Sequence, residues 1–372
     1  MSPLTKEDKL LTKRKSLMTS FLSMVRLKMK DRRIIFIVKR LFHSVFVLWG
    51  LSVLIFVMSR IAPGDPARMA LGTRAPEEVV ERLRIAMHYN EPIYTQYFYW
   101  FKSVLRGNFG VSLVTQHPVL EDISQVFPAT LELAIFAFIF MIVIGITIGV
   151  LSARYNNTWV DNLGRLASYF GIVTPPFVFA TIGMLIFCYL LNVLPAMGRL
   201  SPGMIYPPKI TSLITIDALI QGNFKVFIDA LKHLILPAVS LGLLGMAEEA
   251  RITRASVYNN MKKDYIAAAE SYGIPVRAIM FRDLLKPSLI AVISILGLEF
   301  GALIANAFLV ELIFNWPGFA RYGMNAMLQK DLNAISGVVL ILGIIFVFSN
   351  IIVDLIVDFL DPRIHLIKER NE

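Results

Sequence analysis

The sequence predicts an all-α polytopic membrane protein with six transmembrane helices. Of its 372 residues, 56% are hydrophobic and only 17% are charged, and the mean hydropathy is +0.63. Soluble domains carry about 25% charged residues. The apolar residues are gathered in runs separated by polar segments, and a helix of about 20 apolar residues crosses the hydrocarbon core of a bilayer. This combination indicates repeated membrane crossings.

The chain starts with a basic segment followed by the first span. Residues 1–40 form a basic extension without the apolar core and cleavage site of a signal peptide, and we expect this extension in the cytoplasm. It suits either an anionic membrane surface or a disordered basic tail. Leu41–Ser59 carries no full charge and predicts the first span at residues 41–61, which Pro63 and Gly64 end.

Residues 62–127 are polar and mixed, and we expect them to form an extracytoplasmic subdomain. Pro76–His88 is typical of a surface helix with proline in its first turn. The aromatic residues of 94–101 suit either the headgroup level of the membrane or a small packed core under the loop, and these two roles are compatible.

Residues 129–360 hold the predicted membrane core with the five remaining spans, and residues 361–372 form a cytoplasmic tail after Asp361-Pro362. We place these spans at Ala129–Ala153, Leu166–Leu191, Leu234–Ala247, Pro287–Val310 and Ala334–Phe359. The run at Leu234–Ala247 is short, and the charged residues after it predict a helix that continues out of the membrane. The loop before this run includes a predicted amphipathic segment, Ile216–Leu231, and a Trp316-Pro317-Gly318 turn precedes the last span.

The third span contains a break. Pro175 and Pro176 follow Thr174, and they must interrupt the hydrogen bonds of a helix. A broken helix inside a membrane is tolerated where protein or a watery cavity surrounds it. A kink beside a transport path and a kink made only for packing both account for this motif.

The distribution of Lys and Arg predicts the orientation of the spans. The segments expected inside hold twice as many of these residues as the segments expected outside, and the excess is greatest before the first span. Cytoplasmic loops are enriched in Lys and Arg. We therefore expect both termini in the cytoplasm, as six spans also require.

A charged loop, Asp264–Pro287, lies between two long apolar runs. Asp264 is suited to cap a helix that starts at Tyr265, Gly273 to end it, and Pro275 to the first turn of a second helix. The three alanines between these ends leave the helix smooth. The segment is either a knob for the groove of a partner or an ordinary alanine-rich loop.

These alanines and the glycine resemble the EAA loop of bacterial-type ABC importer permeases, although Ala267 stands where that motif has its Glu. Other stretches narrow the resemblance to the dipeptide/oligopeptide/nickel permease family: Ala62–Pro66, Gly107–Ser112, Leu296–Leu328 and Val353–Ile364. The motifs occur in the family's order, and the resemblance extends from about residue 35 to residue 364.

The resemblance implies a type I ABC importer (MetI-like) permease fold with an extracytoplasmic loop subdomain. It implies a coupling loop at 259–286 that transmits force from the ATPases through Asp264, Tyr265, Ala267, Ala268, Ala269 and Gly273. Its expected partners are a second homologous permease, two ATP-binding subunits and an extracytoplasmic substrate-binding protein, in the lipid bilayer of a prokaryotic cell membrane. The implied cargo is di- or oligopeptides, with nickel chelates and oligosaccharides as alternatives.

The sequence lacks several signatures of chemistry. It has no Gly-Lys pair and therefore no Walker A phosphate loop, so ATP and Mg would be bound by the partner ATPase subunits. Its five His residues lack metal-ligand spacing, and its one cysteine, Cys188, excludes a disulfide within the chain. The net charge of +10 lies beside apolar runs, which fits membrane topology rather than nucleic acid. We expect a transporter subunit and not an enzyme.

Charged residues within spans usually face the protein interior or water. Glu299 lies midway along the fifth span, whereas Asp354 and Asp358 share a helical face near the inner end of the sixth, within reach of Arg251 or Arg254. The residues expected at the translocation path or the permease interface are Glu299, Pro175, Pro176, Asn306 and Asp354. The intramembrane acids also leave open a stand-alone secondary transporter or channel, which would need its own ion-coupling site and inverted repeats, but the charged coupling-type loop argues against it.

Overall fold

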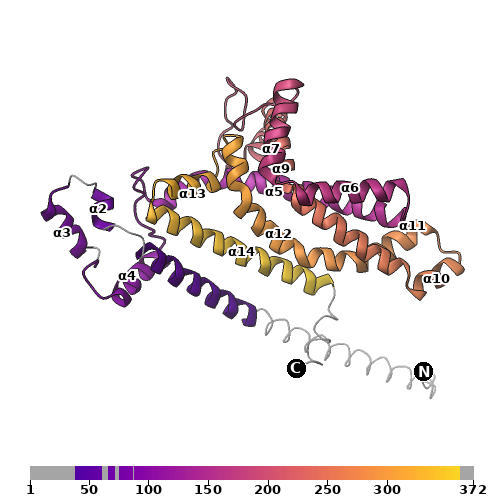
Figure 1. Cartoon of the computed structure of the whole chain (residues 1–372), viewed down its shortest axis with the longest axis horizontal. Helices are drawn as coiled ribbons and strands as arrows, with labels where there is room; N and C mark the ends of the chain where they lie inside the picture. Colours follow the sequence, from indigo (N-terminus) through magenta and orange to yellow (C-terminus); the bar gives the residue numbers. More distant parts are fainter. Residues whose placement is uncertain (1–37, 61–65, 72–74, 87, 361–372) are drawn as a thin grey trace, which may run out of the picture. The chain divides into compact units, whose positions relative to one another are not determined.

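The structure is a computed structural model that describes residues 38–60, 66–71, 75–86 and 88–360 (Figure 1). Most of the predicted 1–40 extension and the whole 361–372 tail lie outside the described residues. The chain divides into two compact units, Met1–Ser52 and Val53–Glu372. The elements discussed below, α2 to α14, belong to the second unit.

The described residues fold as helices, which confirms the all-α prediction. The elements are a first helix Val38–Arg60, α2 Pro66–Leu71, α3 Glu77–Ala86, α4 Ile93–Leu105, α5 Val119–Arg154, α6 Trp159–Val173, α7 Pro176–Gly183, the π-helical η1 Met184–Leu190, α8 Ile214–Ile220, α9 Phe224–Met261, α10 Asp264–Ser271, α11 Val276–Ala278, the π-helical η2 Ile279–Leu285, α12 Lys286–Ile313, α13 Phe319–Leu328 and α14 Leu332–Leu360. Extended pairing within these residues is limited to one isolated bridge, Val111 with Pro118.

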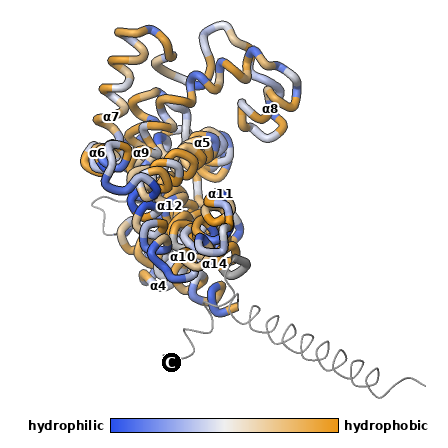
Figure 2. Tube along the Cα trace, turned by 90° about the vertical axis from the view of Figure 1, so that its right-hand side faces the viewer, coloured by the Kyte–Doolittle hydropathy of each residue, from blue (hydrophilic) through white to orange (hydrophobic). Residues whose placement is uncertain are grey.

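Five of the described helices are long and apolar enough to cross a membrane, and a bent pair makes a sixth candidate. The pair is α6 with α7–η1, which meet at 105° across the break at Thr174-Pro175. The structure thus confirms that this motif interrupts the third span. Figure 2, which looks nearly along these helices, shows that hydrophobic residues predominate in the bundle.

The centre of the helix bundle is the contact between α5 and α9. Gly145 and Gly149 of α5 bring the two helices close together, because a Cβ on Gly149 would lie 2.5 Å from the Cβ of Thr253 and 2.7 Å from the carbonyl oxygen of Ala250 on α9. Above this contact, a buried apolar cluster joins α5, α9 and α12 around residues such as Leu133 and Leu234. Such close contact requires residues without a side chain at the crossing.

Several helices differ from their predicted ranges. The third span was expected to begin at Leu166, whereas α6 begins at Trp159. The second span was expected to begin at Ala129, whereas α5 begins at Val119 and includes Pro128 within its length. The amphipathic segment predicted at Ile216–Leu231 is wrong as one helix, because α8 ends at Ile220 and α9 begins at Phe224. Asn223 separates them by accepting a hydrogen bond at 3.2 Å from the backbone N–H of Val226, which caps the new helix. The prediction that the fourth span continues past its apolar run is confirmed by α9.

Candidate functional site

The predicted coupling loop folds as three short helical elements at one end of α12, with α13 at the other end (Figure 1). The helix α10 is held against η2 by one buried side chain, Ile266, which is 4% exposed. Ile266 packs in a small apolar cluster with Ile279 and Leu284 of η2. Tyr265 adds a hydrogen bond of 3.4 Å from its hydroxyl to the carbonyl oxygen of Asp283. The loop therefore has its own core and is not an irregular connection.

The opposite face of α10 is open to solvent. Ala267 and Ala268 are exposed and Ala269 is half-buried, as its place in the apolar cluster requires. Two aromatic side chains flank the exposed alanines: Tyr265 is 45% exposed and Tyr272 is 85% exposed. A smooth strip of small residues between two exposed aromatic rings is suited to packing in a groove of another protein.

The ends of α10 partly match the prediction. Gly273 has a φ of +71°, the left-handed conformation that ends helices, and it donates to the carbonyl oxygen of Glu270. Asp264 is not the cap: it is the first helical residue, and Lys263 stands at the N-cap without a side-chain hydrogen bond. Pro275 stands one residue before α11 rather than in its first turn. The acidic side chain of Asp264 still lies where the helix dipole favours a negative charge.

Three of the predicted path residues come together around one cavity of about 180 Å³. Pro176 contributes from α7, and Glu299 and Asn306 contribute from α12. Gly245 of α9 makes room for the Glu299 carboxylate, which would lie 3.2 Å from a Cβ at that position. Pro175 stands next to the cavity at the bend between α6 and α7. The broken helix and the intramembrane acid thus belong to the same site.

The other predicted acids lie elsewhere. Asp354 is half-buried on α14 and does not line this cavity. The side chain of Asp358 lies outside the described residues. Arg254, one of its suggested partners, forms a two-pronged ion pair with Asp161 of α6, with nitrogen–oxygen distances of 2.7 and 2.8 Å. The sequence reading had assigned no role to Asp161.

Sequence reasoning also missed a buried glutamate. Glu249 was counted with the charged residues that follow the fourth span, yet it is 1% exposed and faces Gly145 of α5. Neither of its carboxylate oxygens has a hydrogen-bond partner among the described residues. The spacing of Glu249 from the buried positions of α9 could have indicated that it shares their face, since the neighbouring Met246 and Thr253 are also buried.

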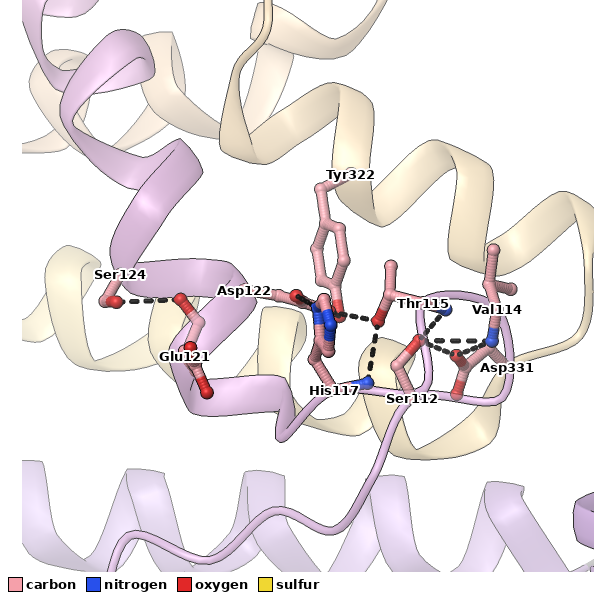
Figure 3. Close-up of polar contacts among 9 residues, drawn as sticks. All are labelled: Ser112, Val114, Thr115, His117, Glu121, Asp122, Ser124, Tyr322 and Asp331. Atoms are coloured by element: carbon pink, nitrogen blue, oxygen red, sulfur yellow. Dashed lines mark hydrogen bonds and ion pairs between the residues drawn. The ribbon is translucent and has the colours of Figure 1, made fainter.

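At the other end of the bundle, Asp331 organises the loop that precedes α5 (Figure 3). Its side chain is fully buried and accepts hydrogen bonds from the hydroxyl of Ser112 at 2.6 Å and from the N–H of Leu113 at 2.7 Å. It also accepts from the N–H of Ala334 at 3.1 Å, in the first turn of α14. One carboxylate therefore joins two segments that are far apart in the sequence.

A second acid of this cluster, Asp122, accepts a hydrogen bond from the hydroxyl of Tyr322 at 3.2 Å and another from Thr115 (Figure 3). His117 lies 3.4 Å from the same carboxylate. Burial raises the pKa of the Tyr322 phenol, and the negative charge of Asp122 raises it further. The phenol therefore stays protonated and donates to Asp122. These contacts join the segment between α4 and α5, and the first turn of α5, to α13 and to the start of α14.

The loop between η1 and α9 is fixed through another buried glutamate. Glu132 of α5 accepts hydrogen bonds at 2.7 Å from the N–H and from the hydroxyl of Thr215, and it pairs with Arg199. Arg199 in turn lies over the ring of Trp316 at 5.7 Å from its centre. The expected Trp316-Pro317-Gly318 turn is thus part of the packed structure, with Trp316 only 1% exposed.

Within the described part of the chain, no group of three or more His, Cys, Asp and Glu side chains is placed to hold a metal ion. The arrangement offers an exposed helix at one end, loops joined by buried hydrogen bonds at the other, and a cavity beside a broken helix between them.

Comparison with known proteins bears on this arrangement. Residues 145–366 match the family described as binding-protein-dependent transport system inner membrane component, and residues 33–134 match the N-terminal part of such a membrane component. The chain is 36% identical over 326 residues to the probable D,D-dipeptide transport system permease protein DdpB of Escherichia coli (strain K12), covering 88% of this chain and 96% of that relative.

Two further relatives align over the same share of the chain. The dipeptide transport system permease protein DppB of Alkalihalophilus pseudofirmus is 37% identical over 328 residues, covering 88% of this chain and 98% of that relative. The glutathione transport system permease protein GsiC of Escherichia coli (strain K12) is 29% identical over 329 residues, with the same two coverages. The chain therefore belongs to the family of binding-protein-dependent transport system inner membrane components.

Proposed function

We propose that this chain is the membrane-spanning permease subunit of an ATP-driven ABC importer for di- or oligopeptides. It would form the translocation path together with a second homologous permease, receive cargo from an extracytoplasmic substrate-binding protein and couple to two ATPase subunits. The relatives named as dipeptide permeases support the peptide cargo. The single structural observation that carries the proposal is α10, a helix with its own core and an exposed face of small residues.

The geometry of α10 suits the transmission of force. Ile266 and Tyr265 fix the helix to η2, and η2 continues directly into α12 at Lys286. A displacement of α10 by the closing ATPase pair would therefore pull on a helix that reaches the Glu299 cavity. ATP binding would drive the membrane domain from an inward-open to an outward-open state, and hydrolysis would reset it.

The test is Ala268→Asp in the assembled transporter. This change places a charge on the exposed strip of α10, where a close-packed contact would have to bury it. We expect normal insertion of the variant into the membrane and loss of ATP-driven peptide uptake by proteoliposomes. The matched control is Ala86→Asp, on an exposed alanine of α3. Full uptake by Ala268→Asp would remove α10 from the coupling mechanism.

The proposal also requires a particular orientation, with both termini and α10 in the cytoplasm and residues 62–127 outside. Cys188 is buried, and Cys188→Ala removes the one native thiol. In that background we expect an impermeant thiol reagent added to intact cells to label Ala86→Cys and to spare Ser271→Cys. Labelling of Ser271→Cys from outside would overturn the orientation and the coupling role together.

We further propose that the cavity at Glu299 lies on the translocation path. The cavity adjoins the break between α6 and α7, where packing can change without unwinding a long helix. A carboxylate there would assist the entry of cationic peptides. Glu299→Gln keeps the shape and removes the charge, so we expect normal assembly with reduced uptake of cationic relative to neutral peptides. Equal uptake of both classes would exclude Glu299 from the path, and loss of assembly would place it at the permease interface.

A further inference from the structure

A second cavity, of about 140 Å³, lies among α5, α6 and α9 and has no part in the function proposed above. It is lined by polar and cationic side chains from all three helices and by one aromatic ring. The lining includes Ser152, Arg165, Ser168, Tyr169, Arg251 and Arg254. Three arginines line this cavity, and the described residues pair only Arg254 and, more loosely, Arg165 with an acid.

The anionic partner within the protein is Asp161, whose side chain is fully buried. It is held by Arg254 at 2.7 and 2.8 Å, by the N–H of Asn157 at 3.0 Å and more loosely by Arg165 at 3.6 Å. One carboxylate thus pairs with two guanidinium groups. Arg251 is exposed, and no ion-pair partner for it is found among the described residues. The cavity therefore carries a net positive charge, with Arg165 and Arg251 able to accept a further anion.

The surroundings of the cavity are those of a membrane surface. The α5–α6 turn carries Tyr155 and Trp159, which are 42% and 72% exposed, and such rings settle at the headgroup level. Along α6, the outward side chains next to the cavity are apolar and open: Leu166 is 64% exposed and Val173 is 78% exposed. A cationic cavity thus continues into an apolar helix face about two turns long.

We propose that this cavity binds the phosphate of an anionic phospholipid headgroup, with the acyl chains lying along α6. Arginine forks match the oxygen geometry of phosphate, and basic pockets between membrane helices bind such headgroups. Free phosphate would use the arginines and leave the apolar face of α6 unused, whereas a phospholipid complements both. Arg254 is held in an ion pair with Asp161 and forms part of the cavity wall. Arg165 and Arg251 supply the positive charge that would contact the lipid phosphate.

The experiment uses the transporter purified with its partner subunits, and the full chain alone, both in a mild detergent. Each sample is incubated with phosphatidylglycerol, cardiolipin or phosphatidylcholine, and native mass spectrometry measures the bound lipid. We expect retention of the two anionic lipids over phosphatidylcholine. Arg251→Gln should weaken this retention by about fivefold, as should Arg165→Gln, since each removes one cation near a lipid surface. The matched control is Arg277→Gln, which removes an exposed arginine of α11.

The outcomes that would overturn the proposal are distinct. Equal retention of phosphatidylcholine, or unchanged retention by Arg251→Gln and Arg165→Gln, would show that the arginines do not select the lipid. Displacement of phosphatidylglycerol by millimolar inorganic phosphate would make the cavity a free-phosphate site. Lipid bound to the isolated chain but not to the complex would show that another subunit covers this face. Retention in the complex, with loss in both arginine variants and not in Arg277→Gln, would support it.

Discussion

Replacement of Gly149 by alanine tests the close contact between α5 and α9. An added Cβ would lie 2.5 Å from the Cβ of Thr253 and 2.7 Å from the carbonyl oxygen of Ala250, both shorter than any normal contact. Overpacking of this kind costs about 1–3 kcal/mol. Alanine also gains about 1 kcal/mol of helix propensity over glycine, so the net loss is up to about 2 kcal/mol. For a chain of this size, this net loss corresponds to a fall of up to about 3 °C in the apparent unfolding temperature.

In the assay, the detergent-purified protein is heated to a series of temperatures, and size-exclusion chromatography measures the fraction that remains folded at each. Gly50→Ala is the matched control, because Gly50 is also helical and no heavy atom lies within 4 Å of its added Cβ, so this variant should be as stable as the wild type or more stable. Adding Thr253→Ala to Gly149→Ala should not restore stability, since the Cβ of residue 253 and the carbonyl of Ala250 remain. A rise in unfolding temperature for Gly149→Ala, or full rescue by Thr253→Ala, would refute a backbone-limited contact.

Three further predictions concern the loops. Gly273→Val should lower ATP-driven uptake more than Gly273→Asn, since a β-branched residue resists the φ of +71° and asparagine tolerates it; equal uptake by the two variants would contradict this. Asp331→Asn should make residues 107–118 sensitive to protease in right-side-out vesicles, because an amide replaces a carboxylate that accepts from Ser112 and two backbone segments; unchanged resistance would count against this role. Burial alone would raise the pKa of Asp217, but hydrogen bonds from Thr211 and from neighbouring N–H groups hold this pKa below its usual value of 3.8. The stabilisation that Asp217 gives the folded loop is therefore complete above pH 3.8 and is lost as the pH falls through the lower folded-state pKa. Protease resistance of residues 194–223 should differ between wild type and Asp217→Asn at pH 7 and converge in strong acid, and a difference that stays constant with pH would be inconsistent with this.

The membrane helices were predictable because an apolar run of sufficient length is most stable when it spans the bilayer. The residues at which these helices begin and end could not be predicted in the same way. The apolar run of the second span begins near Ala129, yet α5 starts at Val119 because its first turns pack against α13 and α14 instead of lipid, and hydropathy does not detect that contact. The break at Pro175 could be located from its local chemistry alone, whereas the 105° angle depends on the helices around it.

In the candidate site too, some features could be predicted from a short stretch of sequence and others depend on how distant helices pack. The exposed alanines and the left-handed Gly273 follow from local sequence, since helix-ending chemistry acts over a few residues. The convergence of Pro176, Glu299 and Asn306 on one cavity depends on how α7 packs on α12, which no single stretch encodes. Asp161 was missed because it is an ordinary charged residue until its burial is known, and Glu249 because its place on the same helical face as Met246 and Thr253 was not used.

The contact between Ser112 and Asp331 has a consequence for the way the protein is made. The two residues are 219 positions apart, and the contact between Thr130 and Glu311 spans 181. At about 5–20 residues per second, the ribosome needs on the order of 10–40 s to reach Asp331 after Ser112 has been translated. During this interval the segment before α5 has left the ribosome without the carboxylate that orders it. Nascent chains that end before residue 331 would therefore leave this segment without its hydrogen-bond partner. Quality-control proteases would have access to the segment until Asp331, just before the last helix, has been made.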